Sequence, residues 1–373
     1  MEDLLAKLVS FHTTEDDPQA MHQALDYIAD YVGKRGMFVE RYNSNGHESL
    51  VATIRPGQKT PTVMLAAHLD VVPAPDELFI MREADGKLYG RGTLDMKFAI
   101  AAYLQLVDDL QDRLEDYDFA IMITCDEETG GINGTAKLLE EGYLPKVAIL
   151  PDGGDNWQIQ TLSKGFVYGK IRAYGKAAHG SRTWQGDNAI LKLIDILAEV
   201  RQLFEQPARM EVSTLNIGQF HGGMATNQVA ADAYATVDAR FINNHEKAKA
   251  LQAIRDVCAK YDAEFDLFLD GAEHRTDLTS TYAEPLARHI RAITGTEVTG
   301  WSTPASSDAR YFADHDIPCL SVYPIGGGHH GPEEWLDRQA FHQYKEVLQA
   351  YLDEIAHTTA TTSVNIAERV DVR

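Results

Sequence analysis

Residues 63–73 read VMLAAHLDVVP, an apolar run that ends in a histidine and an aspartate. An apolar run without polar alternation is typical of a strand buried on both faces, as in a parallel sheet. Similar runs occur at 50–54, 119–124 and 147–150. Helical spacing separates several of these runs, as at 2–9, 18–35, 95–110 and 133–141. The first part of the chain is therefore predicted to form an α/β layered domain.

The pattern changes at about residue 163. Four predicted strands (166–174, 211–217, 229–241 and 264–269) alternate with two predicted helices (188–204 and 246–261). Their order, β-α-β-β-α-β, is the signature of a ferredoxin-like α+β unit. After Gly271 the first pattern resumes, with helices at 278–293 and 336–357 and a buried strand at 319–323. We predict a catalytic domain formed by residues 1–162 and 274–373, interrupted by an inserted domain at 163–273.

The charge excludes some classes of partner. The 373 residues include 34 basic and 56 acidic side chains, a formal net charge of −22, which repels nucleic acid and anionic lipid. No apolar run approaches the roughly 20 residues of a membrane span, and the start of the chain lacks a secretory signal pattern, so we expect a cytoplasmic protein. The three cysteines, Cys125, Cys258 and Cys319, are too far apart to form a CxxC metal site. Any metal ion must bind to His, Asp and Glu.

Two motifs place a possible metal ligand after an apolar run or a glycine turn. His68 and Asp70 are two residues apart, so in a strand Asp70 can hydrogen-bond one imidazole nitrogen and leave the other for a metal ion. A His/Asp pair that only closes the strand end is equally compatible. In YGRGTLDMK (89–97) a glycine-rich turn delivers Asp95 to a helix start, where an ordinary N-cap is the alternative. The motif lacks the third glycine and the GK[ST] of nucleotide-binding loops.

Three further motifs follow predicted strands or glycines. DEETGG (126–131) places three adjacent carboxylates after a buried strand, which is costly unless a cation or solvent compensates them. A solvated acidic loop is commoner, but this position is where α/β sheets place their sites. Asp152 ends another buried strand, with an Asp-Gly turn as the alternative. His329 and His330 follow three glycines, where a flexible surface loop is the alternative.

Together these motifs bring oxygen and nitrogen ligands to the ends of separate strands. Two zinc ions about 3.5 to 4 Å apart, bridged by one carboxylate and a water, need about five such ligands. Glu127 then remains as a general base beside the bridging water. The five predicted ligands are His68, Asp95, Glu128, Asp152 and His330.

The motifs HLDVVP, GRGTLDMK and DEETGG, in this order, resemble those of the dizinc metallopeptidase and amidohydrolase family. That family includes succinyl-diaminopimelate desuccinylase, aminoacylase, carboxypeptidase G, carnosinase and peptidase T, and the resemblance covers nearly the whole chain. It implies a zinc-peptidase-like catalytic domain with a mixed, largely parallel sheet. It also implies that His330 is the ligand in preference to His329, because HGPEE (330–334) resembles the family's histidine followed four residues later by glutamate.

The resemblance also implies a role for each residue of the site. His68 and Asp152 would bind one zinc and Glu128 and His330 the other, while Asp95 would bridge, Asp70 would orient His68 and Glu127 would act as the base.

The insertion resembles the family's lid and dimerisation domain. The resemblance implies a homodimer in which His179 reaches the partner subunit's active site, although an isolated histidine there would be read as a surface residue. It also implies that Asn227 and Arg240 meet the substrate. The fork of Arg240 suits a carboxylate, and its alternative is a salt bridge on a sheet face. Ser307 and Asp308, in SSDARYF (306–312), fall where the family has another site loop.

The resulting hypothesis is a zinc-dependent peptidase that hydrolyses an amide bond in small peptides, with two zinc ions per chain and cobalt or manganese as possible substitutes. The alternative is an N-acyl-amino-acid deacylase, such as a desuccinylase, or a carboxypeptidase. Asp152 favours the peptidase, because the family's di- and tripeptidases resemble this chain in having aspartate there, where its deacylases and carboxypeptidases usually have glutamate. A non-catalytic metal- and peptide-binding protein is the alternative of another class, but it would be expected to lack Glu127 or a ligand.

Overall fold

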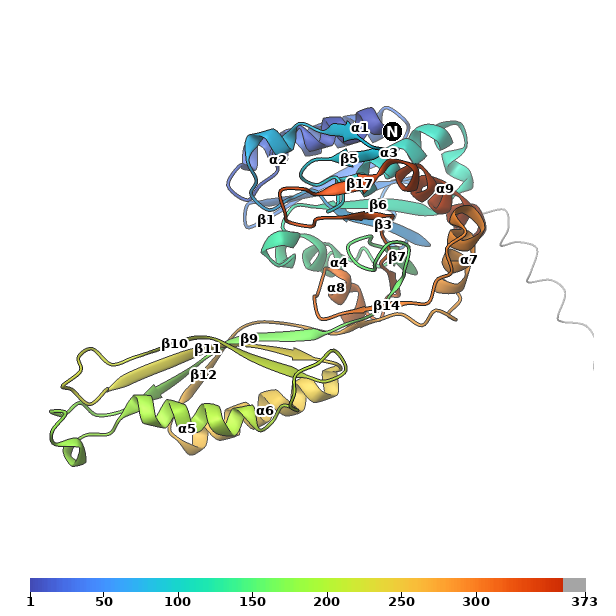
Figure 1. Cartoon of the computed structure of the whole chain (residues 1–373). Coiled ribbons are helices and arrows are strands. Elements are labelled where there is room, and N and C mark those ends of the chain that lie inside the picture. Colours follow the sequence, from blue (N-terminus) through green and yellow to red (C-terminus); the bar gives the residue numbers. More distant parts are fainter. Residues whose placement is uncertain (358–373) are drawn as a thin grey trace, which may run out of the picture. The chain divides into compact units, whose positions relative to one another are not determined.

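The computed structural model describes residues 1–357, which form two compact units (Figure 1). The first unit contains residues 1–161, 275–302 and 307–357. The second unit contains residues 162–274 and 303–306. The predicted fold class, an α/β domain with an inserted α+β unit, is confirmed. Among the described helices, none is both long enough and apolar enough to cross a membrane.

The first unit is built on a six-stranded mixed sheet with the order β1-β2-β6-β3-β7-β15. Strands β3, β6, β7 and β15 run parallel, whereas β1 and β2 are antiparallel to their neighbours. Every residue of β3 and β6 is buried, because both sheet faces are covered. The strands are β1 Phe38–Ser44, β2 His47–Thr53, β3 Val63–His68, β6 Phe119–Thr124, β7 Val147–Ile149 and β15 Cys319–Leu320.

Helices cover both faces of this sheet (Figure 1). Helices α1, α2, α3 and α9 pack together on one face, while α4 and α8 lie on the other. Helix α3 is buried almost all round, and its alanines permit close packing against the strands. The helices are α1 Glu2–Val9, α2 Pro18–Gly33, α3 Lys97–Leu110, α4 Lys137–Glu140, α7 Ala283–Thr294, α8 Ala309–Asp314 and α9 Arg338–Ile355.

A small antiparallel sheet brings distant parts of the chain together in the first unit. Its order is β16-β17-β5-β4, and Tyr89 in β5 pairs with Trp335 in β17. The loop that leaves β5 therefore begins beside the loop that enters β17. These strands are β4 Arg82–Ala84, β5 Lys87–Tyr89, β16 Gly326–Gly327 and β17 Trp335–Asp337.

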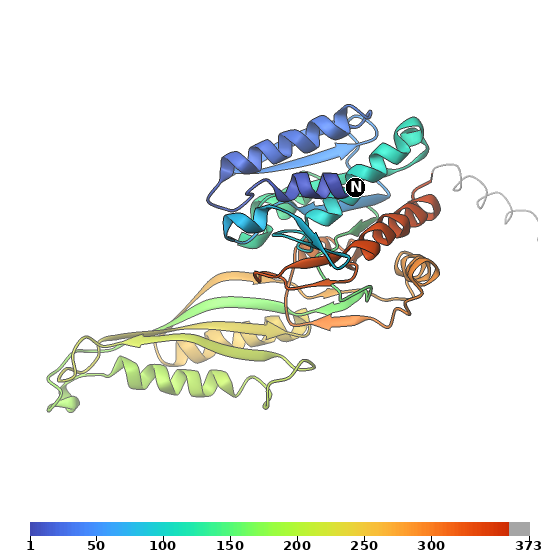
Figure 2. The ribbon, with the colours of Figure 1, turned by 45° about the horizontal axis from the view of Figure 1, so that its top comes forward.

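The second unit has a four-stranded antiparallel sheet with the order β10-β11-β9-β12, and both of its helices lie on one face (Figure 2). Inward residues alternate along β9 and β11, and they form a core with the two helices. The elements follow the predicted β-α-β-β-α-β order, but β10 begins and ends later than predicted. The bounds are β9 Gly165–Tyr174, α5 Ala189–Arg201, β10 Thr214–Gly222, β11 Asp232–Phe241, α6 Asn244–Lys260 and β12 Glu264–Gly271.

Three short strands contain three of the four points where the chain passes between the units, and the fourth lies between residues 306 and 307. They are β8 Gln160–Ser163, β13 His274–Arg275 and β14 Trp301–Thr303.

Candidate metal centre

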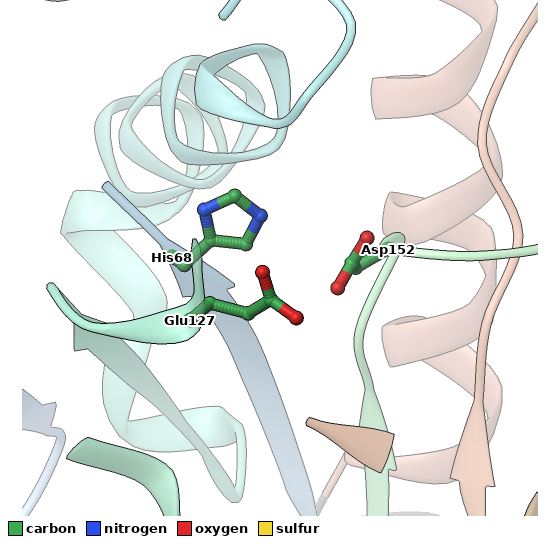
Figure 3. Close-up of side chains that lie close together, drawn as sticks. All are labelled: His68, Glu127 and Asp152. Carbon is green, nitrogen blue, oxygen red and sulfur yellow. The ribbon is translucent and has the colours of Figure 1, made fainter. Parts of the chain in front are cut away.

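Three neighbouring strands deliver side chains to one edge of the main sheet. Strand β3 lies between β6 and β7 and runs parallel to both, so their carboxyl ends meet at the same edge. His68 is the last residue of β3, Glu127 lies just beyond β6 and Asp152 just beyond β7. Figure 3 shows the three side chains turned toward one shared space. One ligand atom from each lies within 4.8 Å of the other two.

Asp95 connects this group with a second one. Its Oδ1 lies 3.1 Å from His68 Nε2, and its Oδ2 lies 3.0 Å from His330 Nε2. Glu128 Oε1 is 3.4 Å from the same nitrogen of His330. Asp95, Glu128 and His330 form a second set of ligand atoms within 4.8 Å of one another. Helix α3 starts at Lys97 without a side-chain cap, so the structure gives Asp95 no capping role.

Asp70 ties two of these segments together. His68 Nδ1 lies 3.0 Å from the main-chain oxygen of Asp70 and 3.6 Å from its Oδ1. The nearer acceptor is thus the backbone carbonyl, whereas the sequence predicted the carboxylate. The other carboxylate oxygen, Oδ2, accepts the main-chain N–H of Glu128 at 2.9 Å. Asp70 therefore fixes both the imidazole and the loop that carries the paired glutamates.

The electrostatics of the cluster fit metal binding. Burial raises the pKa of Asp152 to about 7, and burial together with the Asp152 charge raises that of Glu127 well above its usual value. Burial alone would lower the pKa of His68, but hydrogen bonds to Asp70 and Asp95 raise it well above 6.5. Asp152 Oδ2 is buried without a hydrogen-bond partner among the described residues. A carboxylate oxygen without a hydrogen-bond partner and an imidazole nitrogen are both atoms that bind zinc, so these residues fit metal ions.

The glycine loop points one histidine of the pair at the cluster. His330 faces Asp95 and Glu128, whereas the His329 ring packs edge-on against Tyr323 at a centroid distance of 5.2 Å. Gly328 has φ +79°, and a Cβ there would lie 2.3 Å from the main-chain oxygen of Glu333, so only glycine permits this turn.

The segment around Ser307 lies behind the glutamate loop. Ser307 is buried, and its main-chain oxygen accepts a hydrogen bond from Arg310 at 2.9 Å. Its neighbour Asp308 is also buried, and Asp308 Oδ2 accepts the Thr135 hydroxyl at 2.6 Å. A Cβ on Gly131 would come within 2.0 Å of Asp308 Oδ1. Both residues belong to the motif noted in the sequence, and Asp308 is the one whose side chain contacts the loop.

The other predicted residues lie in the second unit. The segments of His179 and Asn227 run side by side, since Gly180 donates its N–H to the Asn227 carbonyl at 2.7 Å. His179 is exposed, and its Nδ1 lies 2.8 Å from the Ser181 hydroxyl. Arg240 is engaged on the sheet face, where its Nε donates to Asp238 at 2.7 Å and its Nη2 to Tyr168 at 2.6 Å.

A cleft of about 390 Å³ opens beside Asp70 and Glu128 in the first unit. Its lining includes four carboxylates and one histidine, with no lysine or arginine. One of these carboxylates, Glu48, already pairs with Arg41 at 2.8 Å and His22 at 2.7 Å. The lining residues are Glu15, Pro18, Met21, Asn45, Gly46, His47, Glu48, Asp70, Val71, Val72, Pro73, Cys125, Glu128 and Thr129.

Known proteins are similar to this chain in sequence and in fold. Residues 64–354 match the model of Peptidase family M20/M25/M40. The succinyl-diaminopimelate desuccinylase of Acidiphilium cryptum is 29% identical over 369 residues, covering 92% of this chain and 94% of the relative. A Staphylococcus aureus tripeptidase has a similar structure, with a TM-score of 0.78, 20% identity and coverage of 95% and 97% of the two chains. Aminopeptidase PepT of Bacillus cereus also has a similar structure, with a TM-score of 0.78, 19% identity and coverage of 95% of this chain and 97% of PepT.

Proposed function

Because the chain belongs to peptidase family M20/M25/M40, and is thus a metallohydrolase that acts on peptide or amide bonds, we propose that it is a small-peptide hydrolase with two zinc ions per chain. The observation that carries the proposal is Asp95, whose two carboxylate oxygens face different histidines, as a bridging ligand requires. His68 and Asp152 would hold one ion, and Glu128 and His330 the other. The ions, when bound, supply Lewis-acid polarisation of the scissile carbonyl and acidify the attacking water.

Glu127 is the proposed general base. Its carboxylate shares the space between His68 and Asp152, where it can take a proton from the attacking water and return it to the leaving amine. The same position would also permit Glu127 to be a ligand. The variant Glu127→Gln separates the two roles. If Glu127 is the base, the variant loses several orders of magnitude in turnover and keeps its metal. If Glu127 is a ligand, the variant loses metal as well.

Metal analysis of Glu127→Gln and Asp95→Asn provides the experiment. We expect zinc-loaded wild-type protein and Glu127→Gln to approach two ions per chain, and Asp95→Asn to fall well below two. Glu77→Gln, an exposed carboxylate in the same unit, is the control and should change neither metal content nor turnover. A folded wild-type chain that binds no zinc, or a chelated chain that keeps full activity, would contradict the metal assignment.

Peptides with a free amino end are the proposed substrates. Asp152 supports them over succinylated amines, because it stands where the family's deacylases usually have glutamate. The desuccinylase names of relatives near 30% identity support the alternative. Assays with dipeptides, tripeptides, N-acetyl and N-succinyl amino acids decide between them, and preferred turnover of the succinyl compound would refute the peptidase.

The second unit is proposed as a dimerisation lid that supplies His179 to the partner's site, with Asn227 and Arg240 meeting the substrate. Strand β10 supports a dimer, because it is an edge strand with a largely exposed pattern. Mixing inactive His179→Ala with inactive Glu127→Ala subunits should restore activity, because a mixed dimer contains one site with both residues intact. If subunits exchange and the mixture stays inactive, His179 does not act in trans.

A further inference from the structure

We propose that Arg91 and Glu334 form a buried ion pair that positions Asp95 and His330 for metal binding. Neither residue belongs to the two groups of ligand atoms found among the described residues, so both would act through the ligands. The proposal rests on the metal centre proposed above and adds two positioning residues to it.

Glu334 organises the loop that carries Asp95. Its side chain is 1% exposed, and its carboxylate accepts three main-chain hydrogen bonds from that loop. Oε1 accepts the N–H groups of Leu94 at 2.8 Å and Asp95 at 3.1 Å, and Oε2 accepts that of Gly92 at 3.1 Å. Three N–H groups directed at one carboxylate fix the course of the backbone up to the ligand itself.

Arg91 lies on the loop of Asp95 and binds both Glu334 and the backbone of the loop that carries His330. Its side chain is 3% exposed, and Nη1 donates to Glu334 Oε2 at 2.7 Å. Nη2 donates to the main-chain oxygens of His330 at 3.1 Å and Gly331 at 3.3 Å. The planar guanidinium therefore spans the distance between the two loops in a way that a single ammonium group does not.

The pair has a geometric consequence at the cluster. Asp95 Oδ2 and His330 Nε2 are 3.0 Å apart, although the residues are 235 positions apart in the chain. The strands β5 and β17 bring the two loops to the same place, and the ion pair then sets their separation. Groups that orient metal ligands typically change metal affinity about 10- to 100-fold when mutated. Burying two charges contributes little net stability, so the pair is better explained by the positions it enforces.

A second cation lies near Glu334. Lys97 is buried, and its charge interacts with Glu334 as well as with Asp70, while its Nζ donates to the Phe11 carbonyl at 2.9 Å. Removing the Glu334 charge would therefore leave Arg91 buried without its carboxylate partner and would also remove a charge that favours the protonated form of Lys97. The test must separate this cost in folding from a change at the metal centre.

The adjacent pair, Arg82 and Glu333, is a matched control. Its charged atoms are 3.0 Å apart, as in a normal ion pair, but the side chains are 53% and 72% exposed. Glu333 and Glu334 are neighbours in sequence, so Glu333→Gln and Glu334→Gln make the same chemical change in the same loop. Only Glu334→Gln, the substitution of the buried residue, should affect the ligands.

Zinc titration against a chromophoric chelator measures both dissociation constants. His330→Ala identifies the constant that depends on His330. We expect Glu334→Gln and Arg91→Lys to raise that constant about 10- to 100-fold and to change the other less, while Glu333→Gln and Arg82→Lys change neither. Melting of the metal-free proteins is measured in parallel, because a purely structural role would lower the melting temperature without a selective change in zinc affinity.

Wild-type affinity for both ions in folded Glu334→Gln, or a larger loss at the ion that does not depend on His330, would overturn the proposal. If Glu334→Gln does not fold, the double variant Arg91→Met with Glu334→Gln removes both charges of the pair and decides the question by the same titration. Failure of the metal centre itself gives a different result, because then the wild-type chain binds no zinc.

Discussion

Replacing Gly131 by alanine should destabilise the first unit and displace the glutamate loop. Gly131 has φ +65°, and its new Cβ would lie 2.0 Å from Asp308 Oδ1 and 2.7 Å from Asp308 Cγ. Asp308 is buried and bonded to the Thr135 hydroxyl, so its carboxylate cannot turn aside without losing that bond. Both the backbone conformation and the packing therefore oppose the substitution.

The magnitude follows from these two terms. A left-handed conformation costs alanine about 1–2 kcal/mol, and overpacking a buried site costs about 1–3 kcal/mol more. We therefore expect Gly131→Ala to lower the free energy of unfolding by about 2–5 kcal/mol. Gly57 is the matched control, because it has φ +69° but nothing within 4 Å of the added Cβ. Gly57→Ala should show only the conformational cost, so the difference between the variants measures the collision with Asp308.

Urea unfolding and peptide hydrolysis provide the assays. Because Gly131 follows the Glu127–Thr129 turn closely, a shift of about 1 Å there should lower kcat/KM about 100-fold. Gly57→Ala should retain wild-type kcat/KM. The reasoning is refuted if Gly131→Ala is as stable and as active as Gly57→Ala, because Asp308 then does not support the loop.

Three other perturbations test separate parts of the structure. Leu65→Ala in the buried strand β3 should cost about 2–5 kcal/mol in urea unfolding, and a loss below 1 kcal/mol would contradict its place in the core. Tyr143→Phe removes the hydrogen bond that is the main cause of the lowered pKa of Glu40, and should cost about 1 kcal/mol at pH 7. A carboxyl group whose pKa is lowered in the folded state stabilises the fold above the pKa of the unfolded state, and this stabilisation is lost as pH falls through the folded-state pKa. The difference in free energy of unfolding between wild type and Tyr143→Phe should therefore shrink below pH 4.5. A difference that does not change with pH would exclude this cause. Arg240→Lys should raise KM for peptides at least 10-fold while leaving zinc content unchanged, and an unchanged KM would leave Arg240 with its structural contacts to Asp238 and Tyr168.

The main sheet could be predicted because its central strands are buried on both faces. The runs at 63–67 and 119–124 became β3 and β6, and the mixed sheet is confirmed. Strand β1 was missed because FVERYNS is an exposed edge strand without an apolar run. Strand β2 is antiparallel to β6, and the sequence did not show this because burial on both faces produces the same apolar pattern in either direction.

The candidate site was predictable where a polar side chain follows a buried strand closely. His68, Glu127 and Asp152 lie together because three parallel strands end at one edge, which apolar runs reveal. Arg91 and Glu334 were given no role of their own, although the motif around Arg91 was noted and Glu334 served to choose His330. Charged residues in glycine-rich loops read as solvated, and their burial depends on a partner 243 positions away.

The predicted start of helix α3 was wrong for a related reason. Helical spacing extends back to Asp95, but the helix begins at Lys97. The N–H groups of Leu94 and Asp95 donate to Glu334, so a distant carboxylate holds these residues outside the helix. Local propensity contains no information on such a partner.

The two ends of the second unit have a bearing on how such a gene can change. Strands β9 and β12 are antiparallel neighbours, and Phe166, near the entry, pairs with Gly271, near the exit. A segment whose two ends lie close together can be inserted into another domain, or removed from it, with little disturbance of that domain. Two in-frame junctions that lie side by side, one at the entry and one at the exit, are thus enough to exchange the second unit. The second unit can then change while the residues of the candidate metal centre stay the same.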